Sequence, residues 1–221
     1  MSGGADGSAS GGRSEGQRPR ALRDDGVVTP LDAPGPPPSR PRTRVLLLGG
    51  IAALVLAADV LTKVAAVARL EGVGPVKLLG GAVYLVLVRN PGAAFSLATG
   101  YTWVLSLVAV AVVVVIVRIA RRLRSTGWAI ALGLVLGGAL GNLTDRVFRE
   151  PGPLQGHVVD VVSLFAPDGS VWPVFNLADS SIVSGGVLLV LLALTGRELD
   201  GTRSVREVPA ASGRPAEREA R

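Results

Sequence analysis

Acidic and amide side chains beside apolar stretches are the residues of this chain that could carry out chemistry. Four aspartates lie within or next to long apolar runs: Asp59, Asp145, Asp160 and Asp179. Three asparagines and one arginine occur near them: Asn90, Asn142, Asn176 and Arg146. Ionisable residues are costly at membrane depth, so such a group is a functional-site hypothesis by default.

Two carboxyl groups that converge can hydrolyse a peptide bond without a metal ion or a covalent nucleophile. Close carboxylates share a proton, because both cannot easily ionise together. The ionised carboxylate takes a proton from water, while the protonated one polarises the scissile carbonyl and later helps to protonate the leaving amine. The sequence alone does not choose which of the four aspartates form such a pair.

Several of these residues also have a purely structural interpretation. Asp59 and Lys63 are four positions apart, which suits an ion pair on one helix face. Asp145 could form a salt bridge with Arg146 or another neighbour. Asn142 and Arg146 share a helix face because they too are four positions apart.

Asn176 and Asp179 occur where the N-cap and first turn of a helix would fall. Both residue types are favoured at these positions. Asp179 can therefore be interpreted either as a helix cap or as a member of a reactive pair.

Other catalytic classes fit the sequence poorly. The chain has no cysteine and one histidine, His157, which excludes a thiol nucleophile and a multi-histidine metal site. A His-Glu-x-x-His helix and a Gly-x-Ser-x-Gly elbow are both missing. The glycine-rich run 137–141 lacks a phosphate-loop lysine and favours close packing of a membrane helix. We therefore expect neither a metal nor a cofactor.

Four apolar segments must position these residues. They cover residues 45–68, a stretch within 98–117, residues 128–143 and residues 180–195. A helix needs about 20 residues to cross a hydrocarbon core. In lipid every backbone group must be satisfied within the segment, so even the valine-rich second run predicts a helix. The predicted fold class is all-α and integral to the membrane, with four transmembrane helices and small β-rich segments outside the cytoplasm.

Basic residues predict the orientation of the four helices. Arginines precede the first run, follow the second and follow the fourth: Arg40, Arg42, Arg44; Arg118, Arg121, Arg122, Arg124; Arg197, Arg203 and Arg206. The positive-inside rule places both termini in the cytoplasm and the aspartates near the outer face. The net charge of +6 reflects this topology, and we expect no binding to nucleic acid.

The two outer segments are expected to contain β-structure. Residues 77–88 are rich in β-branched residues around Gly80-Gly81. Residues 161–175 carry Asp168-Gly169 at their centre, a strong hairpin signal.

The ends of the chain have a different composition from its centre. Residues 1–43 are rich in Gly, Ser, Arg and Pro and cannot bury enough apolar surface to offset the entropy of ordering. We expect a disordered cytoplasmic tail there, a four-helix membrane domain over residues 44–200 and a second disordered cytoplasmic tail over residues 201–221.

Five short boxes resemble those of the lipoprotein signal peptidase (signal peptidase II) family. Residues 90–96 read Asn-Pro-Gly-Ala-Ala-Phe-Ser, and residues 137–146 read Gly-Gly-Ala-Leu-Gly-Asn-Leu-Thr-Asp-Arg. Residues 158–160 (Val-Val-Asp), residues 175–180 (Phe-Asn-Leu-Ala-Asp-Ser) and Asp59 with Lys63 resemble the others. All five occur in the family's order, over about residues 44–196.

The resemblance implies an aspartic endopeptidase with Asp160 and Asp179 as its catalytic residues. It implies that four further residues line the site and bind substrate or the aspartates: Asn90, Asn142, Arg146 and Asn176. Asp59, Lys63 and Asp145 would support them. The implied substrate is a prolipoprotein cleaved just before a cysteine that carries a diacylglyceryl group, and membrane lipids and globomycin-type inhibitors are expected partners.

The chain departs from the family pattern at two places. Val161 follows the first implied catalytic aspartate, where the family usually has phenylalanine. The connection from Arg146 to Asp160 is several residues longer than expected, with an added turn at Pro151-Gly152-Pro153. We expect this turn to loop outward and to leave Asp160 in place.

Two other functions fit the clustered aspartates. A proton-coupled transporter would use Asp59 as a carboxylate near mid-membrane, although Asp59 lies nearer the outer end, about 22 Å along its helix. A non-catalytic scaffold would use the polar cluster only to order the outer segments.

Overall fold

The computed structural model describes residues 41–92 and 102–203 of the chain. Four helices form its frame: α1 (Pro41–Leu70), α2 (Thr102–Ala120), α3 (Thr126–Phe148) and α4 (Leu177–Leu194). All four are long and apolar enough to cross a membrane. The predicted fold class is therefore confirmed, and the chain is a multi-pass membrane protein. The predictions for residues 1–40 and 204–221, and part of the box at 90–96, lie outside the described residues.

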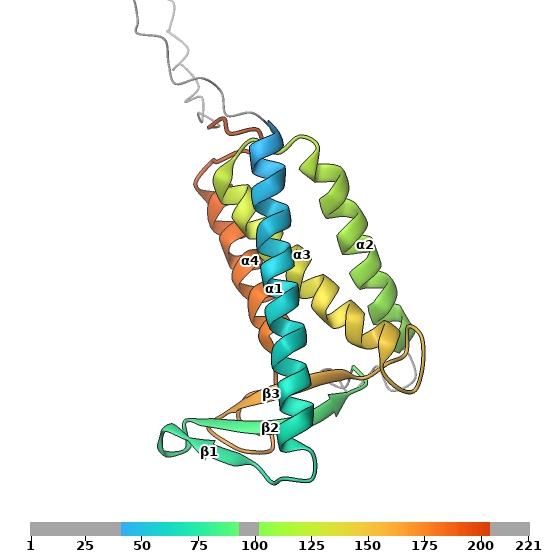
Figure 1. Cartoon of the computed structure of the whole chain (residues 1–221). Helices are drawn as coiled ribbons and strands as arrows, with labels where there is room; N and C mark the ends of the chain where they lie inside the picture. The colour runs from blue at the N-terminus through green and yellow to red at the C-terminus, as the bar shows by residue number, and fades with distance from the viewer. Residues whose placement is uncertain (1–40, 93–101, 204–221) are drawn as a thin grey trace, which may run out of the picture. The chain divides into compact units, whose positions relative to one another are not determined.

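Helix α3 lies among the other three helices and packs closely against α1 and α4 (Figure 1). Glycines permit this close approach. A Cβ atom at Gly137 would lie 2.8 Å from the carbonyl oxygen of Ala52 in α1, and one at Gly138 would collide with the carbonyl oxygen of Ala178 in α4. Such small-residue contacts are typical of membrane helices, where the backbones themselves come together.

Large apolar side chains cover the outer faces of the helices. Leu54 and Leu61 of α1, Val108 of α2 and Val183 of α4 are all more than half exposed. Apolar side chains that face water are driven toward burial, whereas those that face lipid hydrocarbon gain little from being buried. These exposed faces are those expected to contact lipid.

A small antiparallel sheet lies across the helix ends near the C-terminus of α1 (Figure 1). Its strands are β1 (Val76–Leu78), β2 (Val83–Asn90) and β3 (Val158–Leu164), in the order β1-β2-β3. The short 3-10 turn Leu79–Gly81 connects β1 to β2. Gly80 and Gly81 both have positive φ there, 69° and 105°, which glycine adopts readily. The β-structure predicted for residues 77–88 is confirmed.

The hairpin predicted for residues 161–175 is only partly formed. β3 pairs along its length with β2, whereas the returning arm meets β3 at a single bridge between Val162 and Phe175. Pro173 has no backbone N–H to donate to a ladder, and Asn176 already begins the cap of α4. The arm between Asp168 and Asn176 is therefore a loop rather than a second strand.

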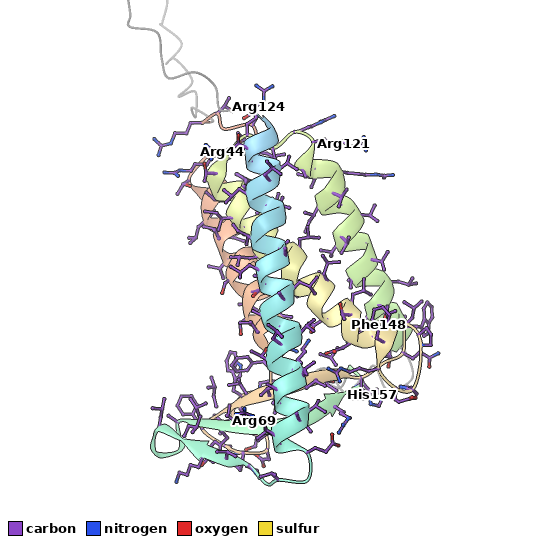
Figure 2. The ribbon with its side chains drawn as sticks, in the orientation of Figure 1. Arg44, Arg69, Arg121, Arg124, Phe148 and His157 are labelled. Carbon is purple, nitrogen blue, oxygen red and sulfur yellow. The ribbon has the colours of Figure 1, made fainter. Side chains whose placement is uncertain are left out.

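Arginines at the start of α1 and between α2 and α3 lie at the end of the helices opposite the sheet. Arg44, Arg121 and Arg124 lie together at one end, whereas Arg69, Phe148 and His157 lie at the other (Figure 2). This segregation agrees with four crossings in alternating directions.

Candidate active site

Strand β3 carries Asp160 into a buried position beside β2. Asp160 is 2% exposed, and its Cα pairs in register with that of Val88. Its Oδ2 accepts a hydrogen bond from Nδ2 of Asn90 at 2.8 Å, two positions further along β2. Its Oδ1 accepts one from Nδ2 of Asn176 at 2.7 Å. Both carboxylate oxygens are thus held by amide donors.

Asp179 lies in the first turn of α4, where it completes a capping box. Oδ1 of Asn176 accepts a hydrogen bond from the backbone N–H of Asp179 at 2.9 Å, and Oδ2 of Asp179 accepts one from the backbone N–H of Asn176 at 3.2 Å. The cap interpretation of these residues is confirmed. The other oxygen, Oδ1, accepts a hydrogen bond from Nδ2 of Asn142 at 2.7 Å. The same geometry that caps the helix therefore fixes the direction of the Asp179 carboxylate.

Asn176 joins the two aspartates. Its side-chain oxygen binds the backbone of Asp179, while its side-chain N–H groups bind Asp160. Both aspartates also line one cavity of about 400 Å³. Asn90, Asn142 and Arg146 line the same cavity, together with the arm Trp172–Phe175. The structure brings together the six residues named from the sequence as catalytic or substrate-binding.

The surroundings of Asp160 change its acidity. Burial raises the pKa of Asp160 to about 6, from an ordinary value of 3.8, and the nearby charge of Asp179 acts in the same direction. The hydrogen bonds from Asn90 and Asn176 and the charge of Lys63 oppose this rise in pKa. A carboxyl group that exchanges its proton near neutral pH is suited to general acid–base catalysis.

Arg146 brings a positive charge to the cavity. It lies on the same face of α3 as Asn142, is 8% exposed and is attracted by Asp160 and Asp179. Its buried Nη1 has no hydrogen-bond partner among residues 41–92 and 102–203. A guanidinium N–H that faces a cavity can donate to a carbonyl oxygen of a bound peptide.

Asp59, Lys63 and Asp145 form a buried network behind the cavity. Nζ of Lys63 lies 2.7 Å from Oδ2 of Asp59 and 3.0 Å from Oδ2 of Asp145. The ion pair expected between Asp59 and Lys63 is confirmed. Asp145 pairs with Lys63 and Arg149 rather than with Arg146, whose side chain lines the cavity.

The position of Asp59 also bears on the transporter alternative. Oδ1 of Asp59 accepts a hydrogen bond from the backbone N–H of Ala178 at 2.9 Å. This contact places Asp59 at the level of the first turn of α4, at the end of the helices near the sheet. A carboxylate level with the end of α4 argues against the transporter alternative, which needs it near mid-membrane.

The long connection between α3 and β3 packs back onto the helices. The backbone N–H of Gly156 donates to the carbonyl oxygen of Arg146 at 3.0 Å, and the hydroxyl of Ser106 in α2 donates to the carbonyl oxygen of Leu154 at 2.7 Å. β3 then begins at Val158 in register with Asn90. Asp160 therefore stays paired with β2. The connection does not project freely, because Leu154, directly after the added turn, contacts α2.

Some residues of the site have no signal in the residue types alone. The apolar arm Trp172–Phe175 and Leu105 of α2 line the cavity, but their sequence suggests only packing or an interfacial anchor. A second cavity of about 250 Å³, lined mostly by apolar side chains of α2, α3 and α4, shares Leu105, Asn142 and Arg146 with the first. The described residues contain no group of three or more His, Asp or Glu side chains that could hold a metal ion.

The fold and the site define a class of protein, a helical membrane protein with two aspartates lining one cavity at one end. Two solved structures, both titled as a bacterial membrane enzyme determined by the in meso method, are similar to it. The structure at 1.9 Å resolution matches with a TM-score of 0.56 and 25% identity over 69% of this chain and 93% of the other. The structure at 2.3 Å matches with a TM-score of 0.57 and 25% identity over 75% of this chain and 95% of the other.

Sequence comparisons narrow the class to one family. A family model described as Signal peptidase (SPase) II matches residues 51–195. The lipoprotein signal peptidase of Rhodococcus jostii is 62% identical over 78% of this chain and 85% of that protein. The one from Mycolicibacterium smegmatis is 56% identical over 76% and 71% of the two chains. The chain belongs to the signal peptidase II family, so it is a membrane peptidase that removes signal peptides from prolipoproteins.

Proposed function

We propose that this peptidase is of the aspartic type, with Asp160 and Asp179 as its catalytic residues. The observation that supports this most strongly is their convergence. Two buried or capped carboxylates from different segments share Asn176 and line one cavity. Close carboxylates of this kind divide one proton between them and need no covalent intermediate.

The two carboxyl groups have different roles in the proposed reaction. Asp160, whose pKa is raised to about 6, holds the shared proton and donates a hydrogen bond to the scissile carbonyl oxygen. Asp179 accepts a proton from the attacking water as the new C–O bond forms. When the C–N bond of the tetrahedral intermediate breaks, the leaving amine takes up that proton.

The remaining polar residues of the site hold the peptide and the proposed catalytic pair, Asp160 and Asp179, which we call the dyad. Asn90 and Asn176 fix both oxygens of Asp160, and Asn142 fixes one oxygen of Asp179. Arg146, whose side chain lines the cavity, binds a backbone carbonyl of the substrate. Because the contacts of Asn90, Asn176 and Asn142 with the two aspartates are made before substrate arrives, the site is preorganised for the reaction.

The substrate is proposed to be a prolipoprotein whose cysteine already carries a diacylglyceryl group, cleaved just before that cysteine. The apolar cavity between α2, α3 and α4 adjoins the catalytic cavity and suits an acyl chain. We place both termini, and with them the tails at 1–43 and 201–221, in the cytoplasm. The membrane domain at 44–200 then presents its site near the outer face, where globomycin-type inhibitors would compete with substrate.

The lipid requirement gives a direct test of the proposed substrate. Purified protein in detergent is expected to cleave a diacylglyceryl-modified prolipoprotein at least about a hundredfold faster than the same precursor without the lipid, since remote binding energy contributes to catalysis. Gel-shift or mass-spectrometric rates measure this ratio. Equal rates on both precursors would show that the lipid is not recognised.

The acidity of Asp160 predicts a pH-dependent stability. Its folded pKa of about 6 lies above the ordinary 3.8, so folding takes up a proton between these values and stability falls as pH rises through them. From pH 5 to pH 7.5 the wild type should lose about 1 kcal/mol through this group, a loss that Asp160→Asn cannot show. Thermal unfolding of both proteins at the two pH values measures the difference. An identical pH dependence in the two proteins would contradict the raised pKa.

A further inference from the structure

Lys63 is a buried charged residue that takes no part in the proposed chemistry, yet its ammonium group is surrounded by oxygen atoms. It is 1% exposed in the middle of a cluster of polar side chains. Its ammonium group has three N–H donors. Three oxygens surround it: Oδ2 of Asp59 at 2.7 Å, Oδ2 of Asp145 at 3.0 Å and Oδ1 of Asn142 at 3.1 Å.

Both carboxylate partners of Lys63 reach onward to the backbone beside the dyad. Asp59 accepts the backbone N–H of Ala178, the residue before Asp179, at 2.9 Å. Asp145 accepts the backbone N–H of Val159, the residue before Asp160, at 3.1 Å. Each catalytic aspartate therefore follows a residue whose backbone is anchored to a carboxylate held by the same ammonium group.

The third partner of Lys63 acts on a dyad side chain. An ammonium group can only donate, so it requires the oxygen of the Asn142 amide to face it. The NH₂ group of Asn142 must then point away, and it donates to Oδ1 of Asp179 at 2.7 Å. Nδ2 of Asn176 also donates to Oδ1 of Asn142, at 3.3 Å, so Lys63 and Asn176 together hold the Asn142 amide in this orientation.

The network is tightly packed where α1 meets α3. A Cβ atom at Gly141 of α3 would lie 2.5 Å from Oδ2 of Asp59. Glycine at this position lets the Asp59 carboxylate fit between α1 and α3 next to Lys63. Arg149, whose side chain is 30% exposed, balances the second carboxylate by pairing with Asp145, so the group of two acids and two bases is neutral overall.

We propose that Lys63 is the positioning residue of the dyad: it sets the spacing of Asp160 and Asp179 through Asp145 and Asp59, and it orients the Asn142 amide toward Asp179. This inference rests on the proposed catalytic role of the two aspartates. It assigns to α1, which contributes no side chain to the cavity lining, the task of joining α3, β3 and α4 at the site.

The test is a charge-balanced double variant, Lys63→Met with Asp59→Asn. It removes one positive and one negative charge together, and the amide introduced at position 59 keeps an oxygen for the N–H of Ala178. We expect a melting temperature close to that of the wild type, a kcat at least about tenfold lower and a KM changed by less than about threefold, since positioning acts on the transition state. Asp59→Asn alone, which retains Lys63 and its bond to Asn142, should lose much less of kcat.

A second readout separates positioning from general structural support. The charge of Lys63 lowers the pKa of Asp160, so the limb of the pH–rate profile that belongs to Asp160 should move to higher pH in the double variant. Four other groups face Asp160 and stay in place: Asp179 from α4, Asn176 at the N-cap of α4, Arg146 from α3 and Asn90 from β2. A change that only loosened the fold would lower the rate without moving this limb.

Matched controls complete the design. Glu71→Gln breaks an ion pair with Arg89 of the same 2.7 Å length that is exposed to solvent, and it should leave kcat unchanged. If the double variant does not fold, Asp145→Asn in the presence of Lys63 should still lower kcat at least about threefold and speed amide hydrogen exchange at Val159.

The outcomes distinguish this inference from the proposed function. A folded double variant with wild-type kcat and pH profile would overturn the role of Lys63, as would a folded Asp145→Asn with unchanged kcat and exchange. If Asp160→Asn or Asp179→Asn keeps full activity, the dyad itself is wrong. Inactive dyad variants together with a fully active Lys63→Met, Asp59→Asn double variant would contradict the positioning role of Lys63 and leave the dyad assignment intact.

Discussion

Replacement of Asp160 or Asp179 by asparagine is expected to lower kcat by at least about a thousandfold, because neither amide can share or transfer the dyad proton. The shape of the side chain is unchanged, so the cavity keeps its form. Each carboxylate oxygen of Asp160 accepts from an amide N–H of Asn90 or Asn176, and one of these bonds becomes a contact between two donors in the variant. We therefore expect a small loss of stability beside a large loss of activity.

Asp168→Asn is the matched control for this prediction. Asp168 lies in the exposed loop between the two aspartates and accepts a hydrogen bond from the backbone N–H of Ser170 at 3.0 Å, which an asparagine oxygen can also accept. Its activity should equal that of the wild type in a prolipoprotein cleavage assay, with thermal unfolding recorded in parallel. Full activity in either dyad variant would refute the assignment.

The second large effect is expected at Gly138, where α3 meets α4. A valine there must place its Cβ against the carbonyl oxygen of Ala178 and 2.7 Å from Cγ1 of Ile182. Because the backbone oxygen cannot move without shifting α4, we expect Gly138→Val to destabilise the protein by about 3 kcal/mol or more. Since Ala178 precedes Asp179, any surviving folded protein should also be poorly active.

Gly186→Val is the control for this substitution. Gly186 lies in the same helix as Ala178, but a Cβ atom built on it meets nothing within 4 Å. Its melting temperature in detergent and its yield of monodisperse protein should stay close to those of the wild type. Comparable losses of stability in the two variants would mean that valine in place of glycine is itself destabilising in these helices, rather than the close contact between α3 and α4.

Much of the fold was predictable because a continuous apolar run that crosses a membrane must satisfy its own backbone hydrogen bonds, which a helix does. The differences occur at helix ends. α4 begins at Leu177, earlier than its apolar run, because the capping box of Asn176 and Asp179 adds a polar first turn. α3 continues to Phe148, because its last polar residues face the site and the Lys63 network instead of lipid. Hydropathy alone cannot recognise a polar turn that is buried in protein.

The site was predictable only in part from the residues themselves. Topology placed the aspartates at one end of the helices, but choosing Asp160 and Asp179 required the resemblance to a family. The spacing of residues could not predict that Asp145 pairs with Lys63. Lys63 lies in α1, far from α3 in the sequence; its hydrogen bond to Asn142 of α3 spans 79 positions. The bridging role of Asn176 depends likewise on how β3 and α4 are placed in space.

A double-mutant cycle in single-turnover kinetics tests most directly whether Asp160 and Asp179 work as one proton-sharing pair. Rate constants for cleavage of a diacylglyceryl-modified prolipoprotein are compared among the wild type, Asp160→Asn, Asp179→Asn and the double variant. A pair that acts as a unit predicts that the double variant is no slower than either single variant, because losing one member already removes the shared proton. Losses that multiply in the double variant would show two independent groups and contradict the account.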